Sequence, residues 1–414
     1  MVGSGMSSPL DPSALATIAT NREFSLFAED LTRCTPQIRD AVEGRRVLVI
    51  GGAGSIGTAA VRTLLPFTPA HLHIIDQDEN GLAELVRDLR SGPAATGVPD
   101  LRTLPLDYGA PAMRRFVEDE PPYHLILNFA ALKHVRSEKD IYSLTQLLDT
   151  NVVRQARFLD WIAKSGRETR YFSVSTDKAA NPVNLMGVSK RVMEHVMFSG
   201  IRPLPTGSRV TSARFANVAF SAGSLLDSFL RRIARRQPLA VPRETFRYFV
   251  STEEAGQICV IAATAVPNRH IAFPRLSAQH DLRRLDEIAA GVVERSGWTP
   301  TFVDDEDAAR AAMERLTLSG RYPIMLTERD TSGEKPFEEF VARGEREVEI
   351  GFAKLAALSY QGVGKDALRE CLSKVEALAA GERRATKREV IEWIRCVEGI
   401  FEHLDTGRNL DERM

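Results

Sequence analysis

Short apolar runs alternate with amphipathic stretches from Arg45 to about Arg214, and this rhythm limits the possible fold more than any other feature of the chain. In order, the runs are RVLVIGG, HLHIID, LRTLPLD, HLILNFAA, RYFSVST and RVTSARF. Strands that alternate with helical segments are typical of crossover units, which build parallel sheets. We therefore predict an α/β protein with a doubly wound, mostly parallel sheet.

The rest of the chain divides around this region. Residues 1–44 have helix-like spacing and are predicted to form a helical N-terminal extension before a first domain at 45–215. Residues 216–340 are predicted to form a smaller α/β substrate region, which can exchange segments with the first domain. Residues 341–414 have apolar positions at helical period, with glycine near the breaks, and are predicted to form a helical C-terminal extension. Packing or oligomerisation is the role expected of this extension.

Charge and cysteine content exclude several classes of protein. The formal net charge is -1, with basic and acidic residues intermixed, so no broad positive field exists for a nucleic-acid partner. The four cysteines lie far apart, which argues against a zinc cluster and a disulfide framework, and we expect no metal site. No apolar run approaches the roughly 18 residues needed to span a bilayer, and no signal-peptide pattern opens the chain. We expect a cytoplasmic protein without a membrane span.

A glycine-rich turn separates the first predicted strand from the helix that follows it. In RVLVIGGAGSIGTAAVRTLL the glycines fit both G-x-x-G-x-x-G and G-x-G-x-x-G. Without side chains, the backbone can turn tightly and present amide groups and a helix N-terminus to a pyrophosphate. The strand, turn and helix together predict a dinucleotide site in a Rossmann domain. The predicted cofactor contacts in this turn are Gly51, Gly54, Ser55, Ile56 and Gly57.

Asp76 ends the second predicted strand, roughly twenty residues after the glycines, where a carboxylate can accept hydrogen bonds from an adenosine ribose. Its neighbours Gln77, Asp78 and Glu79 include no arginine that could neutralise a ribose phosphate. NAD is therefore favoured over NADP. Asp107, at the end of the third strand, could contact the adenine amine, and an ordinary strand-end turn is the alternative interpretation.

A series of later motifs resembles one known family. After the glycine turn come LNFAALKHVRSEKD, the pair Thr150 and Asn151, VSTDKAANPVNLMGVSKRVMEH, RFANVAFSAGSLLDSFLRRI and RDTSGEKPFEEF. In this order they resemble the extended short-chain dehydrogenase/reductases that act on nucleotide sugars, across residues 45–340. The group they resemble most is the polysaccharide-biosynthesis (CapD-like) branch, which contains the UDP-N-acetylglucosamine 4,6-dehydratases. The resemblance implies a NAD-dependent lyase.

A methionine stands where most members of this family carry a tyrosine. In those relatives a tyrosine and a lysine spaced Y-x-x-x-K lie on one helical face, and the tyrosine takes the sugar hydroxyl proton as hydride leaves. Met186 and Lys190 keep that spacing. The resemblance implies that Lys190 holds the cofactor ribose, whereas a thioether cannot accept and return a proton. We expect Met186 to pack in the core, and some members of the dehydratase branch also carry methionine here.

Thr176, Asp177 and Lys178 directly follow a predicted strand, at the carboxyl edge where ligands of this fold bind. By resemblance, Asp177 is the acid for the leaving C6 hydroxyl, Lys178 is the base for the C5 proton, and Thr176 hydrogen-bonds the sugar. A solvated ion pair on a loop is the alternative interpretation of Asp177 and Lys178. The group that takes the C4 hydroxyl proton stays open, and a relay through Thr176 or water to Lys190 is one route.

Further residues are implied by the resemblance alone. Asn128 and Ala130, at the end of the fourth strand, would lie near the cofactor, and Arg247 matches an arginine that binds the diphosphate. The alternative interpretations are solvated loop residues for Lys133 and His134, a purely structural role for Asn128, and a surface-helix start for Glu334. Ala216 and Ala222 replace a usual glycine and a frequent arginine, so the grip on the pyrophosphate can differ. The implied substrate contacts are Lys133, His134, Asn217, Ser224, Arg247 and Glu334.

The leading prediction is a 4,6-dehydratase for a UDP-N-acetylglucosamine-like substrate. It would move hydride from C4, remove water across C5 and C6, and return hydride to C6. A nucleotide-sugar 4-epimerase is the first alternative, which the loss of the tyrosine and the presence of Asp177 and Lys178 disfavour. A non-catalytic NAD-binding regulator is the second; Met186 favours it and Lys190 opposes it. We also expect a homo-oligomer.

Overall fold

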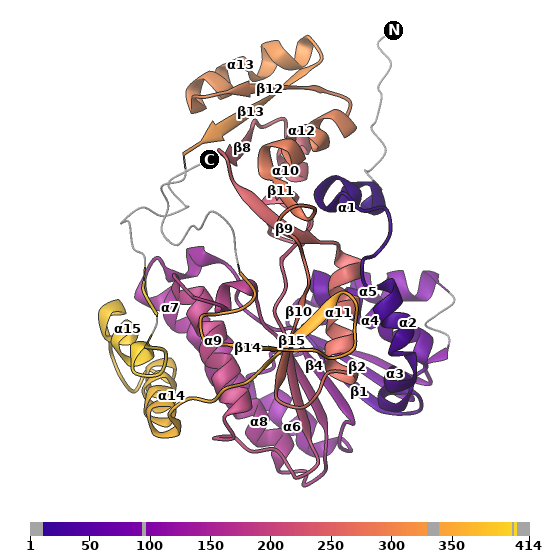
Figure 1. Cartoon of the computed structure of the whole chain (residues 1–414), viewed down its shortest axis with the longest axis vertical. Coiled ribbons are helices and arrows are strands. Elements are labelled where there is room, and N and C mark those ends of the chain that lie inside the picture. The colour runs from indigo at the N-terminus through magenta and orange to yellow at the C-terminus, as the bar shows by residue number, and fades with distance from the viewer. Residues whose placement is uncertain (1–10, 93–96, 329–338, 400, 404–414) are drawn as a thin grey trace.

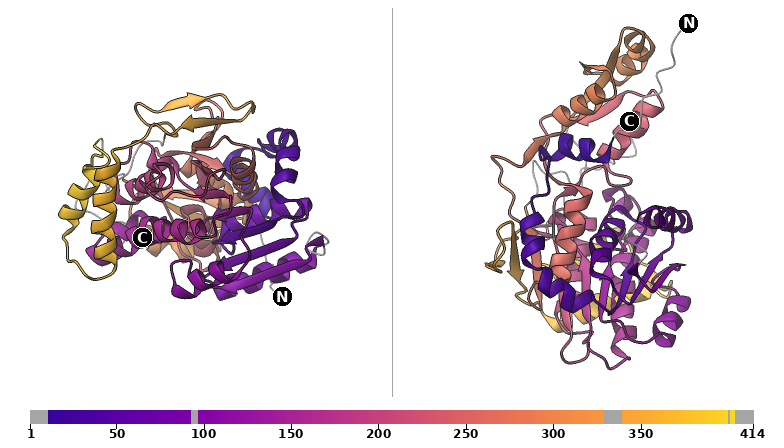
Figure 2. Two further views of the ribbon diagram at one scale, coloured as in Figure 1. Left: turned by 90° about the horizontal axis from the view of Figure 1, so that it is seen from below. Right: turned by 90° about the vertical axis from the view of Figure 1, so that its right-hand side faces the viewer.

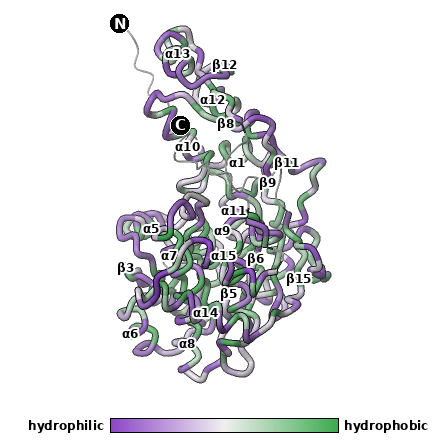
Figure 3. The backbone as a smooth tube through the Cα atoms, turned by 90° about the vertical axis from the view of Figure 1, so that its left-hand side faces the viewer, coloured by the Kyte–Doolittle hydropathy of each residue, from purple (hydrophilic) through white to green (hydrophobic). Residues whose placement is uncertain are grey.

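The structure is a computed structural model that describes residues 11–92, 97–328, 339–399 and 401–403. A larger body and a smaller lobe that projects from one end of it make up the molecule (Figure 1). The side view in Figure 2 shows that this projection makes the molecule elongated. Each of the two parts has a hydrophobic core of its own, and hydrophobic stretches of backbone occur in both (Figure 3).

A nine-stranded sheet forms the centre of the larger body. The predicted apolar runs all form strands of it, and the order β3-β2-β1-β4-β5-β6 is that of a doubly wound dinucleotide-binding domain. Neighbouring strands are parallel except where β15 pairs with β10 and with β14. Across the sheet the strands are β14 (Arg346–Val348), β15 (Leu355–Ser359), β10 (His270–Pro274), β6 (Arg209–Ala213), β5 (Arg170–Val174), β4 (Leu125–Asn128), β1 (Arg46–Ile50), β2 (His71–Asp76) and β3 (Asp100–Pro105).

Helices cover both faces of this sheet, which is why its central strands are continuously apolar. On one face α11 packs closely on α4. Gly256 allows this, since a Cβ there would lie 2.6 Å from the Ala59 backbone. This face carries α4 (Ser55–Leu64), α5 (Glu79–Ser91) and α11 (Thr252–Thr264). The other face carries α6 (Pro111–Asp119), α7 (Ile141–Leu148), the π-helical turn η4 (Asp149–Val153), α8 (Arg154–Ala163) and α9 (Leu185–Phe198). Short 3-10 turns are η1 (Leu65–Phe67), η3 (Val135–Glu138) and η5 (Asp177–Ala179).

The smaller lobe combines two three-stranded sheets with three helices. One sheet is β12 (Thr299–Val303), β13 (Arg321–Thr327) and β8 (Leu239–Pro242), and the other is β11 (Leu282–Arg284), β9 (Phe246–Val250) and β7 (Asn217–Val218). The helices are α10 (Leu225–Ala234), α12 (Leu285–Arg295) and α13 (Glu306–Leu318). Two segments within residues 216–340, α11 and β10, lie in the larger body.

The N-terminal residues form helices that belong to both parts of the molecule. Helix α1 (Pro12–Thr20) packs on β9 and α12 in the smaller lobe. Helices α2 (Ala28–Arg33) and α3 (Thr35–Val42) pack on α11 in the larger body. The N-terminal extension therefore does not form a separate unit.

The C-terminal segment differs from the helical extension that its periodicity predicts. Residues 365–379 and 387–395 do form helices, α14 (Lys365–Ala379) and α15 (Lys387–Arg395), which pack on α7 and α9 respectively. The run LAALS instead forms β15, and β14 extends the sheet further. A short run that is buried on both faces has no period, so sequence cannot separate strand from helix there. No described helix is both long and apolar enough to cross a membrane.

Candidate functional site

The glycine turn between β1 and α4 forms one wall of a cavity of about 540 Å³. Gly51 has φ +74°, and a Cβ there would lie 2.7 Å from the amide nitrogen of Ala130. A glycine is therefore required at this position. Gly54 lines the cavity and precedes α4 without a side-chain capping bond, so the first amides of the helix remain available to an anion. This wall suits a pyrophosphate.

Asp76 lies in the same cavity, at the end of β2. Its Oδ2 accepts a hydrogen bond from the Ala53 amide at 3.0 Å, and its Oδ1 accepts one from the Asp78 amide at 3.0 Å. The carboxylate thereby holds the glycine turn while its remaining lone pairs face the cavity. The position fits the predicted contact with a ribose hydroxyl.

Asp107 also lines this cavity, but it is held in an ion pair that the sequence did not reveal. Arg154 Nη1 lies 2.5 and 2.6 Å from its two carboxylate oxygens, and the Gly109 amide donates to Oδ1 at 2.8 Å. Arg154 lines the cavity as well. A contact between Asp107 and adenine stays a prediction. Arg154 is a further charged group beside Asp107 in this cavity.

Asn128 holds the backbone beside the cavity and does not line the cavity itself. Its side chain is buried, and its Oδ1 accepts from the Ala130 amide at 3.0 Å. Its Nδ2 donates to Gln155 Oε1 and to the Tyr171 hydroxyl. Ala130 does line the cavity. We therefore assign Asn128 a positioning role, with Ala130 at the surface that a cofactor would touch.

A second cavity, of about 320 Å³, adjoins the first and shares Phe129, Ala131 and Leu132 with it. It brings together most of the residues predicted for catalysis and substrate binding, from four separate segments of the chain. Those that line it are Lys133, His134, Thr176, Asp177, Lys178, Met186, Lys190, Asn217 and Ser224, and Ile56, predicted as a cofactor contact, lines it as well. Glu334 lies outside the described residues.

Asp177 and Lys178 form an ion pair in the turn η5, shortly after β5, with Asp177 buried and the Lys178 side chain 22% exposed. Asp177 is 2% exposed, so the alternative of a solvated pair on a loop does not hold. Its Oδ1 accepts from Lys178 Nζ at 3.1 Å and from the Thr176 hydroxyl at 2.8 Å. Thr176 also caps the turn by accepting from the Lys178 amide. The side chains predicted as acid, base and sugar-binding hydroxyl thus line one cavity.

Met186 and Lys190 lie one turn apart on α9, and both face the second cavity. Met186 is 3% exposed and belongs to the core of the larger body, which agrees with the packing role expected of it. Lys190 is buried, and its Nζ lies 3.1 Å from Met193 Sδ, a weaker acceptor than oxygen. Burial lowers the pKa of Lys190 to about 8, although Glu194 opposes the change.

This lowered pKa predicts how stability depends on pH. At pH values between the lowered pKa of about 8 and the usual pKa of 10.5, the unfolded chain binds a proton at Lys190 that the folded chain does not. The free energy of unfolding therefore rises with pH in this range. Relative to Lys190→Met, we expect the wild type to gain about 1.5 kcal/mol between pH 8 and 9.5 in urea unfolding. Lys164→Met, at an exposed lysine, is the control and should show a flat difference. A flat difference for Lys190→Met would contradict the prediction.

The loop after β7 lines the second cavity. The Ala222 amide donates to Ser55 Oγ at 3.0 Å, and Lys133 Nζ donates to the Ala222 carbonyl at 2.9 Å. Ser55 and Lys133, both predicted as ligand contacts, therefore also hold this loop. Ser224 caps α10 by accepting from the Asp227 amide. Ala222 is the sequence position at which the family that the chain resembles often has an arginine.

Arg247 is not among the described residues that line either cavity. It lies on β9 directly opposite Arg283 of β11, and its Nη1 donates to the Phe246 carbonyl. A contact with a diphosphate therefore stays a prediction from the resemblance.

Sequence reasoning missed a buried charge network behind the turn η5. The Ser175 hydroxyl donates to Glu194 Oε1 at 2.6 Å, and the guanidinium of Arg214 binds both carboxylate oxygens of Glu194 at 2.9 and 2.6 Å. Arg214 also contacts Glu345, as does Arg191. Burial would raise the pKa of Glu345, but Arg214 and Arg191 outweigh it and lower that pKa to about 2. The signal for this network that the sequence did contain was the presence of charged residues inside otherwise apolar segments.

Comparison with known proteins places this geometry in context. The family model described as polysaccharide biosynthesis protein matches residues 47–358. The probable polysaccharide biosynthesis protein EpsC of Bacillus subtilis is 27% identical over 357 residues, which are 83% of this chain and 54% of EpsC. An inverting UDP-N-acetylglucosamine 4,6-dehydratase of Campylobacter jejuni is 27% identical over 238 residues, 56% of this chain and 67% of that protein. The chain thus spans about half the length of EpsC.

Solved structures share the fold at low identity. Pen from Bacillus thuringiensis aligns with TM-score 0.62 and 18% identity, over 81% of this chain and 98% of Pen. A variant of the UDP-glucuronic acid 4-epimerase from Bacillus cereus, in complex with a fluorinated UDP-sugar and NAD, aligns with TM-score 0.51 and 12% identity. That alignment covers 74% of this chain and 90% of the epimerase. Both dehydratases and epimerases are therefore represented among the similar proteins.

Proposed function

The chain belongs to the polysaccharide biosynthesis protein family, a branch of the extended short-chain dehydrogenase/reductases, and on this premise we propose that it is a nucleotide-sugar 4,6-dehydratase. The observation that carries the proposal is the ion pair of the buried Asp177 with the partly buried Lys178, which shares one cavity with Lys190 and Met186. An acid and a base are what elimination of water requires, and a methionine cannot supply either.

The first cavity fits NAD. Gly51 and Gly54 leave room for a pyrophosphate at the start of α4, and Asp76 is placed for a ribose. When bound, NAD supplies the oxidant for C4 and the reductant for C6 of the sugar. The residues that would hold it are those of the glycine turn, Asp76, Ala130 and, at the nicotinamide end, Lys190. The NAD complex of the Bacillus cereus enzyme of the same fold supports this choice.

The pair can exist in two forms that hold the same number of protons and differ only in which of the two side chains carries one of them. Transfer of a proton from Lys178 Nζ to Asp177 Oδ1, across their 3.1 Å hydrogen bond, gives a neutral amine and a carboxylic acid. Lys178 is then a base for the C5 proton, and Asp177 is an acid for the C6 hydroxyl, which leaves as water. After elimination Asp177 is an anion again and Lys178 is a cation. Lys178 then returns a proton to C5 as hydride adds to C6, and the proton released from the C4 hydroxyl replaces it, so the pair regains its starting charges at the end of the cycle.

Because Lys178 holds the proton from C5 after elimination, solvent can exchange with it before a proton returns to that carbon. The product gains a C4 carbonyl and a C6 methyl group and loses one water. A UDP-linked N-acetylhexosamine is the substrate we propose, since a UDP-N-acetylglucosamine dehydratase is among the relatives.

A 4-epimerase is the alternative that the comparisons also allow. That reaction oxidises and reduces C4 without elimination, so the ion pair of Asp177 and Lys178 would have no chemical role in it. It also depends on the acid/base that a thioether cannot replace. Both observations favour the dehydratase.

The test is incubation of the full chain with UDP-N-acetylglucosamine and NAD in deuterated water, followed by mass spectrometry and NMR of the product. Loss of one water with one deuterium at C5 is expected. An unchanged mass with inverted C4 would identify an epimerase. Absence of conversion across a panel of UDP- and dTDP-linked hexoses would overturn the proposal.

A further inference from the structure

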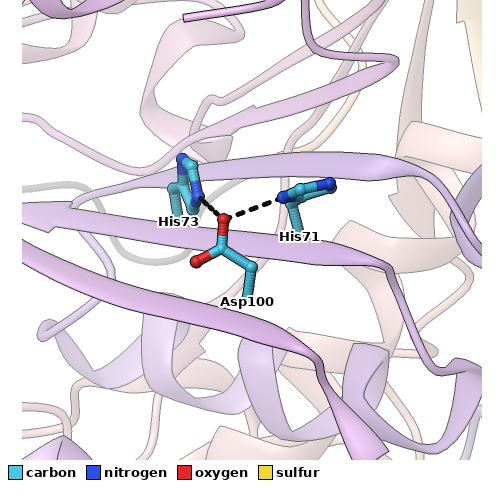
Figure 4. Close-up of side chains that lie close together, drawn as sticks. All are labelled: His71, His73 and Asp100. Carbon is cyan, nitrogen blue, oxygen red and sulfur yellow. Dashed lines mark hydrogen bonds and ion pairs between the residues drawn. The ribbon is translucent and has the colours of Figure 1, made fainter.

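Two histidines and an aspartate converge on the larger body, away from both cavities (Figure 4). His71 and His73 occupy alternate positions of β2, so their side chains lie on the same face of the sheet. Asp100 begins β3 and is the register partner of His71. The cluster lies at the start of β2, whereas Asp76 at the end of the same strand faces the first cavity.

The three side chains present one metal-binding atom each within a small space. His71 Nδ1 lies 2.8 Å from Asp100 Oδ2, and His73 Nε2 lies 3.0 Å from the same oxygen. All three atoms lie within 4.8 Å of one another. Ligand atoms of a tetrahedral zinc site are about 3.3 Å apart, as bonds of about 2.0–2.1 Å require. Small side-chain rotations would therefore admit an ion between them.

Outer contacts hold these groups as they do in metal sites, where a ligand is usually fixed through its second polar atom. The other ring nitrogen of His73, Nδ1, lies 2.6 Å from the Tyr123 hydroxyl. The other carboxylate oxygen of Asp100 accepts from Arg102 Nε at 2.8 Å. The charge of Arg102 is in turn met by Glu120 at 2.9 Å.

One histidine of the cluster is buried and the other is partly exposed, which suits binding of an ion from solution. His73 is fully buried, so one side of the cluster is closed to water. The side chain of His71 is 36% exposed and leaves one side open to water. An ion can therefore enter at His71 and keep a water ligand there.

We propose that His71, His73 and Asp100 bind one zinc-class divalent transition metal ion, with water completing the coordination. Two imidazoles and one carboxylate suit zinc and its neighbours in the first transition row, whereas calcium and magnesium prefer oxygen ligands alone. The ion would tie the edge strand β3 to β2, and β3 leads directly to Asp107 in the first cavity. The site is independent of the reaction proposed above.

The test is a zinc titration of the full, untagged chain, stripped with a chelator, against a chromophoric zinc indicator. We expect one zinc per chain, with an affinity at least about 100-fold weaker in His71→Gln and in Asp100→Asn. His280→Gln, at an exposed histidine elsewhere, should match the wild type. Zinc should also raise the melting temperature of the wild type and leave that of His71→Gln unchanged.

Several outcomes would overturn the proposal. They are the absence of stoichiometric zinc, affinities that are equal in the wild type and His71→Gln, and displacement of zinc by equal concentrations of magnesium. In each case the three side chains would form a plain hydrogen-bonded cluster, with Asp100 accepting from both rings. Circular dichroism of metal-free His71→Gln separates loss of binding from loss of fold.

Discussion

Asp177→Asn and Lys178→Ala are each expected to lower the rate of water loss by about 10³-fold, the range of general acid or base catalysis. Asparagine keeps the shape of the side chain and can still accept from the Thr176 hydroxyl, but its amide is too weak an acid to transfer a proton to the C6 hydroxyl. Alanine removes the amine that faces Asp177 in the second cavity. Turnover is measured by mass spectrometry with saturating UDP-N-acetylglucosamine and NAD.

The two variants should fail at different steps. Lys178→Ala should lose exchange of the C5 proton with deuterated water, because the base is missing. Asp177→Asn should retain some exchange at C5 while losing elimination. Titration calorimetry should show NAD affinity within a few fold of the wild type in both, since neither residue lines the first cavity.

Met186→Leu is the matched control in the same cavity. It conserves the volume of a core side chain, a change that usually destabilises by less than about 1.5 kcal/mol. We expect it to keep most of the activity, because Met186 carries no proton. Equal activity in all three variants would contradict the roles assigned to Asp177 and Lys178.

Arg214→Met is expected to lower the free energy of unfolding by about 3–5 kcal/mol. Arg214 is fully buried and neutralises Glu194 and Glu345, which a methionine leaves without this partner. The Ser175 hydroxyl, which donates to Glu194, would lose a fixed acceptor shortly before the turn η5. Urea unfolding at neutral pH measures the effect, and activity at permissive temperature should fall as well.

Arg62→Met is the control for this second prediction. Arg62 forms an exposed ion pair with Asp88 on the same body, and such pairs contribute about 0–1 kcal/mol. A loss below about 1 kcal/mol in Arg214→Met would show that the two carboxylates find other partners, such as Arg191. The C-terminal segment would then be less closely coupled to α9 than the contacts indicate.

Most of the parallel sheet could be predicted from local pattern. Each apolar run between residues 45 and 214 forms a strand at its expected place, because strands buried on both faces must be continuously apolar. The C-terminal run LAALS could not be assigned in this way. Its strand depends on β10, a neighbour far away in sequence, and such pairing leaves no periodic trace in a short apolar run.

The candidate site shows the same division. Thr176, Asp177, Lys178, Met186 and Lys190 could be placed together because one strand and the helix after it bring them to a single edge of the sheet. Arg154 and Arg247 could not be placed from sequence. The first reaches Asp107 from a different helix, and the second is oriented by its pairing with β11.

The sequence by itself determined the doubly wound sheet, the glycine turn and the turn η5, because each is a local motif whose geometry follows from a few adjacent residues. Only the tertiary structure decided that Glu345 meets Arg214 and Glu194 behind Ser175, and that Asp100 meets His71 and His73. Buried charges must be paired, but which residues pair depends on how distant segments pack. That information lies in long-range contacts, which no local pattern records.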